Sequence, residues 1–448
     1  MGRLFGTDGA RGIANEGLSC ETSMNIGRAA AMVLASHCTE KPKVLIGKDT
    51  RISSDMLENA LVAGLLSVGA DVILVGVVPT PATAYLIRHY GADAGIMISA
   101  SHNPCEYNGI KLFDGNGYKL PDTLEEEIEG IVLDRTREIP SPTGGDIGRV
   151  VYEPDASDIY IEHLKSTVDV SLSGLKVALD CANGSSAVTA EKLFKALGAD
   201  CYLISNKPNG ININENCGST HMGNLIEFVM RSKMDLGLAF DGDADRCLAV
   251  DSEGNLIDGD KMIAIAAKDM KDRGVLAENT AVMTVMSNLG FFHFAKANGI
   301  KVEVTKVGDR YVLEEMRKSG YIIGGEQSGH IIYLEHASTG DGQLSGIQLM
   351  AIMKRTGKTL NELGSVMDSF PQVLVNIKTT NEIKAKYEND ESVKAAIRDA
   401  SDILGEDGRV LVRASGTEPL IRVMLEGKDE EQITALANSI ADVIKSLT

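Results

Sequence analysis

Residues 43–76 read "KVLIGKDTRISSDMLENALVAGLLSVGADVILVG", an order of strand, loop, helix and second strand. The apolar run from Val44 to Ile46 predicts a buried strand, and the apolar spacing after it indicates an amphipathic helix. Gly69 stands where that helix should end, because glycine readily adopts the left-handed conformation that closes a helix. This order predicts a right-handed crossover in a mostly parallel sheet.

The same unit occurs twice more along the chain. Residues 175–205 read "LKVALDCANGSSAVTAEKLFKALGADCYLIS", and residues 281–306 read "AVMTVMSNLGFFHFAKANGIKVEVTK". Gly198 and Gly299 stand at the corresponding helix ends. Three such units predict three similar α/β domains with mixed sheets.

A further strand follows each unit and runs into a polar loop. The loops are "SASHNP" at 99–104, "DGDADR" at 241–246 and "GGEQSGH" at 324–330. Because ligands of open α/β sheets bind beyond the carboxyl ends of the strands, three sheets would present three different loops to one central cleft.

The last part of the chain has a different pattern. Residues 373–380 and 408–427 are strand-like, and residues 390–402 and 429–447 are helix-like, which predicts a smaller C-terminal α+β domain. Proline- and glycine-rich residues 139–148 and the stretches near 254–260 and 366–371 suggest boundaries. The predicted domains are 1–148, 149–255, 256–368 and 369–448.

The charge of the chain limits its partners. The 448 residues include 63 acidic and 44 basic ones, a formal charge of −19, which argues against nucleic acid or an anionic membrane as a partner. An anionic ligand must therefore be held by a local cluster of Arg and Lys. Seven scattered cysteines without a C-x-x-C motif suggest reduced thiols. With neither a signal peptide nor an apolar run of about 20 residues, the sequence predicts a cytoplasmic protein.

The loop after residue 240 carries three aspartates at alternate positions, Asp241, Asp243 and Asp245. Three converging carboxylates repel one another unless a hard cation lies between them, and Mg²⁺ favours a few carboxylates plus a phosphate oxygen. A solvated acidic turn is the alternative, because Asp and Gly are common in turns. An aspartyl-nucleophile phosphatase would also place D-x-D after a strand, but it leaves Ser101 without a role.

Ser101 is a candidate nucleophile or carrier of a phosphoryl group. A free serine is a weak nucleophile and needs a nearby base or metal, for which His102 and Lys111 are candidates as proton shuttles. The alternative is an Asx-type turn. The chain has no G-x-S-x-G elbow and no P-loop motif, which disfavours an α/β-hydrolase and a P-loop ATPase.

Three other loops suit a sugar phosphate. "RASGTEPLIR" at 413–422 combines small residues, hydroxyls and two arginines, a pattern typical of a phosphate site. "VGDR" at 307–310 places an arginine at the start of a helix. "GEQSGH" offers Glu326, Ser328 and His330 to sugar hydroxyls. Taken alone, each of these loops could also be an ordinary turn.

The motifs "GTDGARG", "ISASHNP", "DGDADR", "GEQSGH" and "RASGTEPLIR", in this order over the whole chain, resemble the α-D-phosphohexomutase superfamily. The N-terminal "MGRLFGTDGARG" and the form "GEQSGH" are most similar to its bacterial members that act on glucosamine phosphates.

The resemblance implies four domains around a central cleft and assigns site residues. Ser101 would be a phosphoserine and a metal ligand, together with Asp241, Asp243 and Asp245 around Mg²⁺. Lys111, Arg246 and Arg11 would lie beside the transferred phosphoryl group, with His102 as a further catalytic candidate. Substrate-binding residues would be Glu326, Ser328, His330, Gly308, Asp309 and Arg310. The phosphate that is not transferred would be held by Arg413, Ser415, Gly416, Thr417 and Arg422.

The implied reaction interconverts glucosamine 6-phosphate and glucosamine 1-phosphate through a phosphoserine and a bisphosphorylated sugar, in amino-sugar and cell-wall precursor synthesis. Glucosamine 1,6-bisphosphate or glucose 1,6-bisphosphate would act as the activator, and a homodimer is plausible by analogy. The alternatives are a phosphomannomutase or phosphoglucomutase of the same fold, the aspartyl phosphatase, and a non-enzymatic sugar-phosphate sensor. Three intact aspartates argue against the sensor, and Cys105 has no assigned role.

Overall fold

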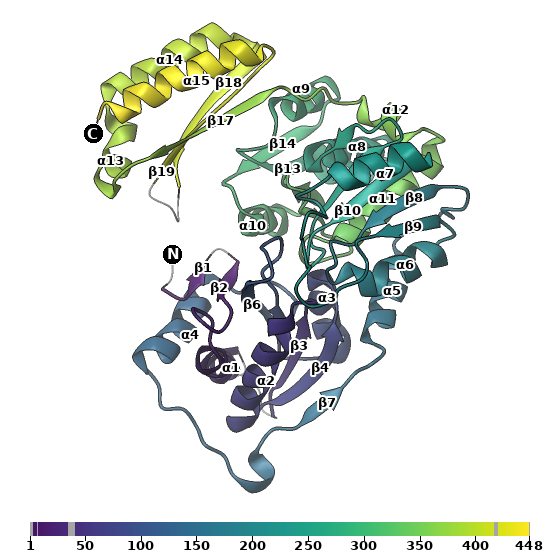
Figure 1. The fold of residues 1–448 in the computed structure, drawn as a ribbon, viewed down its shortest axis with the longest axis vertical. Coiled ribbons are helices and arrows are strands. Elements are labelled where there is room, and N and C mark those ends of the chain that lie inside the picture. Colours follow the sequence, from purple (N-terminus) through teal and green to yellow (C-terminus); the bar gives the residue numbers. More distant parts are fainter. Residues whose placement is uncertain (1–2, 7, 35–40, 416–419, 448) are drawn as a thin grey trace. The chain divides into compact units, whose positions relative to one another are not determined.

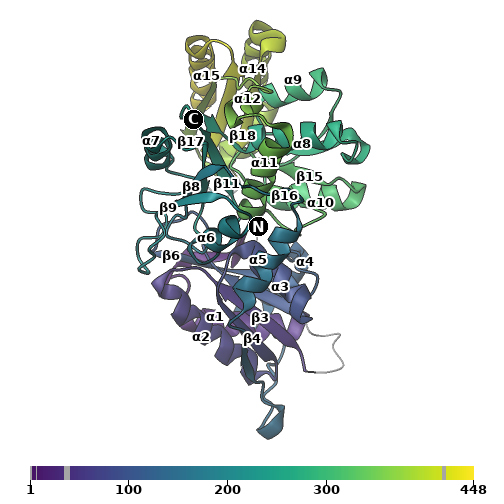
Figure 2. The ribbon, with the colours of Figure 1, turned by 90° about the vertical axis from the view of Figure 1, so that its right-hand side faces the viewer.

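The structure is a computed structural model that describes residues 3–6, 8–34, 41–415 and 420–447 (Figures 1 and 2). The chain forms two compact units. The first comprises Met1–Met286 and Gly299–Val366, and the second comprises Ser287–Asn298 and Met367–Thr448. Three mixed sheets and one antiparallel sheet confirm the predicted fold class. The four domain boundaries and the central cleft stay predictions.

The first sheet has seven strands in the order β1-β2-β6-β5-β3-β4-β7. Its strands are β1 (Phe5–Gly6), β2 (Gly9–Ile13), β3 (Lys43–Lys48), β4 (Asp71–Val77), β5 (Ala94–Ile98), β6 (Tyr107–Asp114) and β7 (Val150–Tyr152). The accompanying helices are α1 (Cys20–Leu34), α2 (Ile52–Ser67), α3 (Thr80–Tyr90) and α4 (Asp122–Asp134).

Side-chain alternation divides this sheet between two layers of helices. Val44 and Ile46 of β3 point into a core shared with α1, α2 and α4. The glycines of alternate positions face α3: a Cβ on Gly47 would lie 2.4 Å from Thr83 Oγ1, and one on Gly95 would lie 2.1 Å from Ile87 Cδ1. Helix α3 therefore packs directly on the backbone of the central strands.

The second sheet has the order β12-β11-β10-β8-β9, and the third has the order β14-β13-β15-β16. The second contains β8 (Lys176–Asp180), β9 (Asp200–Ile204), β10 (Leu236–Phe240), β11 (Cys247–Asp251) and β12 (Leu256–Ile257). The third contains β13 (Thr280–Thr284), β14 (Lys301–Thr305), β15 (Ile323–Gly325) and β16 (Ile331–Tyr333). Their helices are α5 (Ala156–Ser166), α6 (Ser186–Ala196), α7 (Gly223–Ser232), α8 (Gly259–Asp272), α10 (Asp309–Ser319), α11 (Gly342–Thr356) and α12 (Leu360–Gly364).

The three mixed sheets repeat one topology. The runs β4-β3-β5-β6, β9-β8-β10-β11 and β14-β13-β15-β16 each have three parallel strands and an antiparallel fourth. The chain reverses between the third and fourth strands. Each reversal holds one of the three polar loops singled out in the sequence, which confirms the predicted repeat.

The glycines expected at the helix ends have the required backbone. Gly69, Gly198 and Gly299 follow α2, α6 and α9 (Leu289–Ala297) with φ of 90°, 93° and 61°. Other residues are strained at such angles, so these positions fix where each crossover turns back to the sheet.

The second unit is built around a three-stranded antiparallel sheet in the order β17-β19-β18. Its elements are β17 (Gln372–Lys378), α13 (Asn381–Lys386), α14 (Glu391–Leu404), β18 (Gly408–Ala414), β19 (Leu420–Gly427) and α15 (Glu430–Lys445). Helices α14 and α15 lie side by side on one face (Figures 1 and 2). Helix α9 joins this unit because Glu426 accepts hydrogen bonds from Leu289 N at 3.0 Å and from Asn288 Nδ2 at 3.3 Å.

One short strand differs from the sequence-based assignment. Residues 149–152 lie in the predicted second domain, and β7 within them pairs with β4 of the first sheet, a pairing that the sequence analysis did not predict. The pairing was hidden because three residues give too little periodicity to distinguish a strand from a linker. Among the described residues, no helix is long and apolar enough to cross a membrane.

We expect Gly95→Ala to destabilise the fold by about 1–3 kcal/mol, because the added methyl overlaps the fully buried Ile87 and forces α3 away from the sheet. Chemical denaturation followed by circular dichroism measures the shift. The control is Gly223→Ala in the first turn of α7, where a Cβ meets nothing within 4 Å. Equal midpoints for the two variants would contradict this account of the packing of α3.

Candidate active site

The serine loop of the first sheet meets the acidic loop of the second. Ser101 lies three residues beyond β5, is 1% exposed and has φ of 53°. Its hydroxyl donates a hydrogen bond to Asp241 Oδ2 at 2.6 Å. Two segments 140 residues apart in the sequence therefore join at one buried contact.

A buried arginine and an asparagine hold the serine loop. Arg51 Nη2 donates to the carbonyl oxygens of Ser101 at 3.1 Å and Asn103 at 2.6 Å. Asn214 Nδ2 donates to the same two oxygens at 2.9 and 3.0 Å. Arg51 is itself paired with the buried Asp49. Because the backbone of the loop is fixed from both domains, the position of the serine hydroxyl is fixed as well.

The close approach of the two loops requires a glycine at position 242. A Cβ there would lie 2.6 Å from Ser101 O and 2.9 Å from Asn214 Nδ2. Any side chain at Gly242 would push the acidic loop away from the serine loop.

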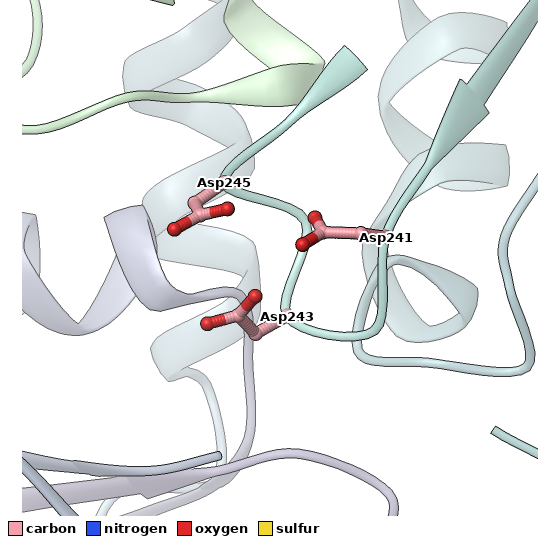
Figure 3. A group of neighbouring side chains, drawn as sticks. All are labelled: Asp241, Asp243 and Asp245. Carbon is pink, nitrogen blue, oxygen red and sulfur yellow. The ribbon is translucent and has the colours of Figure 1, made fainter. Parts of the chain in front are cut away.

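The acidic loop between β10 and β11 gathers three buried carboxyl groups, Asp241, Asp243 and Asp245 (Figure 3). One oxygen of each lies within 4.8 Å of the others. Asp243 Oδ1 and Asp245 Oδ1 are buried without a hydrogen-bond partner in the described part of the chain. Buried carboxylate oxygens without donors suit a hard cation, so this triad could hold a metal ion.

The three aspartates have different electrostatic surroundings. Burial, followed by the charges of Asp245 and Asp243, raises the pKa of Asp241 well above its usual value. Burial also opposes ionisation of Asp243, but the Lys111 ammonium at 2.7 Å and the Thr80 hydroxyl at 2.5 Å outweigh it and lower its pKa. A divalent cation would offset both the burial and the carboxylate repulsion that raise the pKa of Asp241.

Cations surround the triad on two sides. Lys111 on β6 is buried and also lies 3.1 Å from Asp8, which forms an ion pair with Arg11. Burial opposes the charge of Lys111, yet Asp243 and Asp8 raise its pKa, so Lys111 keeps its proton. Arg246 Nε lies 3.8 Å from Asp245 and 4.0 Å from Asp241.

His102 faces the serine, which sequence adjacency alone did not guarantee. Its Nδ1 lies 3.3 Å from Ser101 Oγ. Burial and the nearby Arg246 and Arg11 lower the pKa of His102 to about 4. The imidazole is therefore neutral at pH 7 and can accept a proton from a hydroxyl.

The loops expected to bind the sugar come together at the third sheet. Glu326 Oε1 accepts a hydrogen bond from Gly308 N at 3.0 Å, and Ser328 is exposed. The buried His330 places Nε2 at 3.5 Å from Asp309 Oδ2 and 3.8 Å from Asp245 Oδ2. The sugar-binding candidates thus approach the triad.

Arg310 forms a hydrogen bond and ion pairs with other residues of the protein. Its guanidinium donates to Leu120 O and forms ion pairs with Asp122 and Glu125. The structure therefore assigns Arg310 contacts within the protein, and its predicted contact with substrate stays untested.

In the second unit, Arg413 and Arg422 are directly opposite each other on β18 and β19. Burial and the charge of Arg422 lower the pKa of Arg413, as expected for two close guanidinium groups. Lys384 Nζ donates to Ser415 O at 2.6 Å. Gly416 and Thr417 of the same predicted phosphate site lie outside the described residues.

The structure adds residues that the sequence analysis did not single out. They are Asp8, Thr80, Lys119, Arg51 and Asn214, all within hydrogen-bond or ion-pair distance of site residues. Asp8 lies inside the motif "GTDGARG" and had a detectable signal. The others contact residues more than 45 positions away in the sequence, and no local pattern reports such contacts.

Four models of protein-family domains match successive parts of the chain. Models of the phosphoglucomutase/phosphomannomutase α/β/α domains I, II and III match residues 2–138, 158–254 and 258–370, and the C-terminal domain model matches residues 374–443. A phosphoglucosamine mutase of Clostridium perfringens is 57% identical over 446 residues, covering 100% of this chain and 99% of the relative. That of Clostridium novyi is 56% identical over 99% of both chains.

The chain belongs to this family, in its phosphoglucosamine mutase branch.

Two solved structures share the fold of this chain. A family protein from Burkholderia thailandensis aligns with a TM-score of 0.83 at 23% identity, covering 99% of this chain and 97% of that one. Aspergillus fumigatus N-acetylphosphoglucosamine mutase, solved with GlcNAc-6P and magnesium, aligns with a TM-score of 0.63 at 19% identity, over 91% and 83% of the two chains.

We expect Gly242→Ala to lower mutase turnover by about 100-fold while leaving the protein folded, because the methyl separates Ser101 from the triad and misplacement by about 1 Å has that effect. A coupled assay of glucosamine 1-phosphate formation measures turnover. Gly223→Ala, far from the loops in sequence and in open space, is the matched control. Unchanged turnover in Gly242→Ala would show that the close approach of the loops is not needed.

Proposed function

We propose that Ser101 carries the phosphoryl group that the protein exchanges with glucosamine 6-phosphate and glucosamine 1-phosphate. The observation that supports this most is the 2.6 Å contact between Ser101 Oγ and Asp241 within the buried aspartate triad. In the first half-reaction, the bond between phosphorus and Ser101 Oγ breaks and a bond to the free sugar hydroxyl forms. The resulting sugar bisphosphate returns its other phosphate to Ser101.

We further propose that Mg²⁺ is held by Asp241, Asp243, Asp245 and the Ser101 oxygen. Hard oxygen ligands suit this ion, and two of the carboxylate oxygens have no hydrogen-bond donor among the described residues. When bound, Mg²⁺ neutralises phosphoryl charge and lowers the barrier to phosphoryl transfer. The relative from Aspergillus fumigatus was solved with magnesium, which supports the choice of ion.

Charge repulsion explains why so many cations surround the serine. Two dianionic phosphates about 5 Å apart repel each other by roughly 13 kcal/mol at an effective dielectric of about 20. Lys111 and Arg246 contact the triad and Arg11 pairs with Asp8, so we propose that these three residues supply positive charge to the phosphoryl group on Ser101. Such preorganised charge is the main contribution of a protein to phosphoryl transfer.

The protonation states favour different roles for His102 and Lys111. The sugar hydroxyl loses a proton as its oxygen bonds to phosphorus. His102 is neutral at pH 7 and lies next to Ser101 Oγ, so we assign it the role of proton acceptor. Lys111 keeps its proton and therefore contributes charge.

The loops of the third sheet and of the last domain contain the proposed binding residues for the substrate. We propose that Glu326, Ser328, His330 and the segment Gly308, Asp309 and Arg310 bind the sugar. Arg413, Ser415, Gly416, Thr417 and Arg422 would hold the phosphate that is not transferred, with glucosamine 1,6-bisphosphate or glucose 1,6-bisphosphate as the activator. A cytoplasmic location and a homodimer remain part of this proposal.

The first test concerns the phosphoserine. Protein incubated with glucose 1,6-bisphosphate should show by intact mass a species one phosphate heavier, and Ser101→Ala should lose both that species and turnover. Ser173→Ala, at an exposed position, is the control. Full turnover in Ser101→Ala would rule out the carrier role, and higher turnover on mannose or glucose phosphates than on glucosamine phosphates would contradict the proposed substrate.

The second test concerns the metal. We expect Asp243→Asn to lower turnover by at least about 100-fold and to raise the half-saturating Mg²⁺ concentration by more than about tenfold, because one ligand charge is lost. Titration of activity with MgCl₂ measures both. Asp200→Asn, an exposed site in the same predicted domain, should leave both values unchanged. An unaltered Mg²⁺ dependence in Asp243→Asn would exclude it as a ligand.

A further inference from the structure

Lys119 joins two carboxylates from different parts of the chain. It follows β6, in the segment that leads to α4, and its side chain is 11% exposed. Its ammonium lies 2.5 Å from Asp8 Oδ1 and also forms an ion pair with Asp309 at the start of α10. Burial opposes the charge of Lys119, but Asp309 and Asp8 raise its pKa, so this cation is permanent.

The two carboxylates that Lys119 contacts lie in different parts of the site: Asp8 is near the triad, and Asp309 is near the sugar-binding loop. Asp8 lies 3.1 Å from Lys111, which is 2.7 Å from Asp243 of the triad. Asp309 follows Gly308, whose N–H binds Glu326, and lies 3.5 Å from His330. Lys119 therefore connects the phosphoryl-transfer centre to the sugar-binding loop, in addition to the 3.8 Å contact of His330 with Asp245.

The contacts form a closed ring. From Asp245 it passes through His330, Asp309, Lys119, Asp8 and Lys111 back to Asp245, with 3.8 Å from Asp245 to both His330 and Lys111. Acidic and basic side chains alternate around it. Removing Lys119 would leave the half-buried carboxylates of Asp8 and Asp309 without the cation that both of them contact, and their repulsion would move the start of α10 away.

We infer that Lys119 is a positioning residue that sets the sugar-binding loop relative to Ser101 and Lys111. This inference rests on the proposed function. Lys119 itself need not touch substrate, because its effect passes through Asp309 to the loop that holds Glu326.

Contacts that do not involve Lys119 also join α10 to α4 and to Tyr118. A variant that weakens one of these contacts can therefore show whether Lys119 positions the loop or only helps to attach α10. Arg310 pairs with Asp122 and Glu125, and the Arg317 guanidinium lies 3.8 Å from the centroid of the Tyr118 ring. Tyr118 and Arg310 are sequence neighbours of Lys119 and Asp309, but these contacts do not involve Asp8 or the triad. Arg317→Gln is therefore a matched control that weakens the attachment and leaves the ring intact.

The test uses enzyme phosphorylated with glucose 1,6-bisphosphate and compares two fates of the phosphoryl group. One is transfer to glucosamine 6-phosphate in a single turnover, and the other is hydrolysis by water without sugar. Lys119→Met should slow transfer to sugar by about 100-fold and change hydrolysis by less than about threefold. Lys119→Arg keeps both ion pairs and should recover transfer to within about tenfold of wild type, and Arg317→Gln should stay within about twofold.

Three outcomes would overturn the inference. They are wild-type transfer in Lys119→Met, an equal loss of transfer and hydrolysis, and a loss of transfer in Arg317→Gln as large as in Lys119→Met. If Lys119→Met does not fold, Asp309→Asn should show the same split between transfer and hydrolysis, and its absence there overturns the inference too. Failure of the wild type to form a phosphoserine would instead contradict the proposed function.

Discussion

The site depends on the hydrogen bond between Ser101 and Asp241, because it joins the loop of the first sheet to the loop of the second. Neither loop forms the site alone: the serine loop lacks carboxylates and the acidic loop lacks a nucleophile. Gly242 permits the contact, and Arg51 and Asn214 fix the serine loop on the other side. The chemistry of the protein therefore rests on the precision with which two sheets pack against each other.

Electrostatics explains why the site tolerates so much buried charge. The chain carries a formal charge of −19, yet its three buried aspartates lie among Lys111, Arg246 and the Asp8–Arg11 pair. Lys111 favours the ionised form of Asp243, whereas burial and neighbouring carboxylates favour a protonated Asp241. Carboxylates whose pKa values are shifted in opposite directions are typical of a site that binds a cation and an anionic substrate.

The sequence analysis singled out residues that directly follow a clear apolar strand or helix pattern. Ser101 and the aspartates follow apolar strands, and the three helix-ending glycines mark the repeat, so local periodicity was enough. Thr80, Lys119 and Asn214 were missed because their importance lies in contacts with residues far away in the sequence. The ion pairs of Arg310 with Asp122 and Glu125 were likewise not visible in its local pattern, and its contact with substrate stays a prediction. The strand β7 was too short to be recognised.

The shared order of strands in the three mixed sheets has a consequence for how this protein arose. In each of these described sheets, a run of four strands has the same order, and the reversal before the antiparallel strand carries a different set of polar residues. This is the pattern that successive duplications of one ancestral gene segment would leave. Each copy could then change its own loop without disturbing the others, so that the serine loop, the aspartate loop and the loop with Glu326 would have diverged from a common starting point.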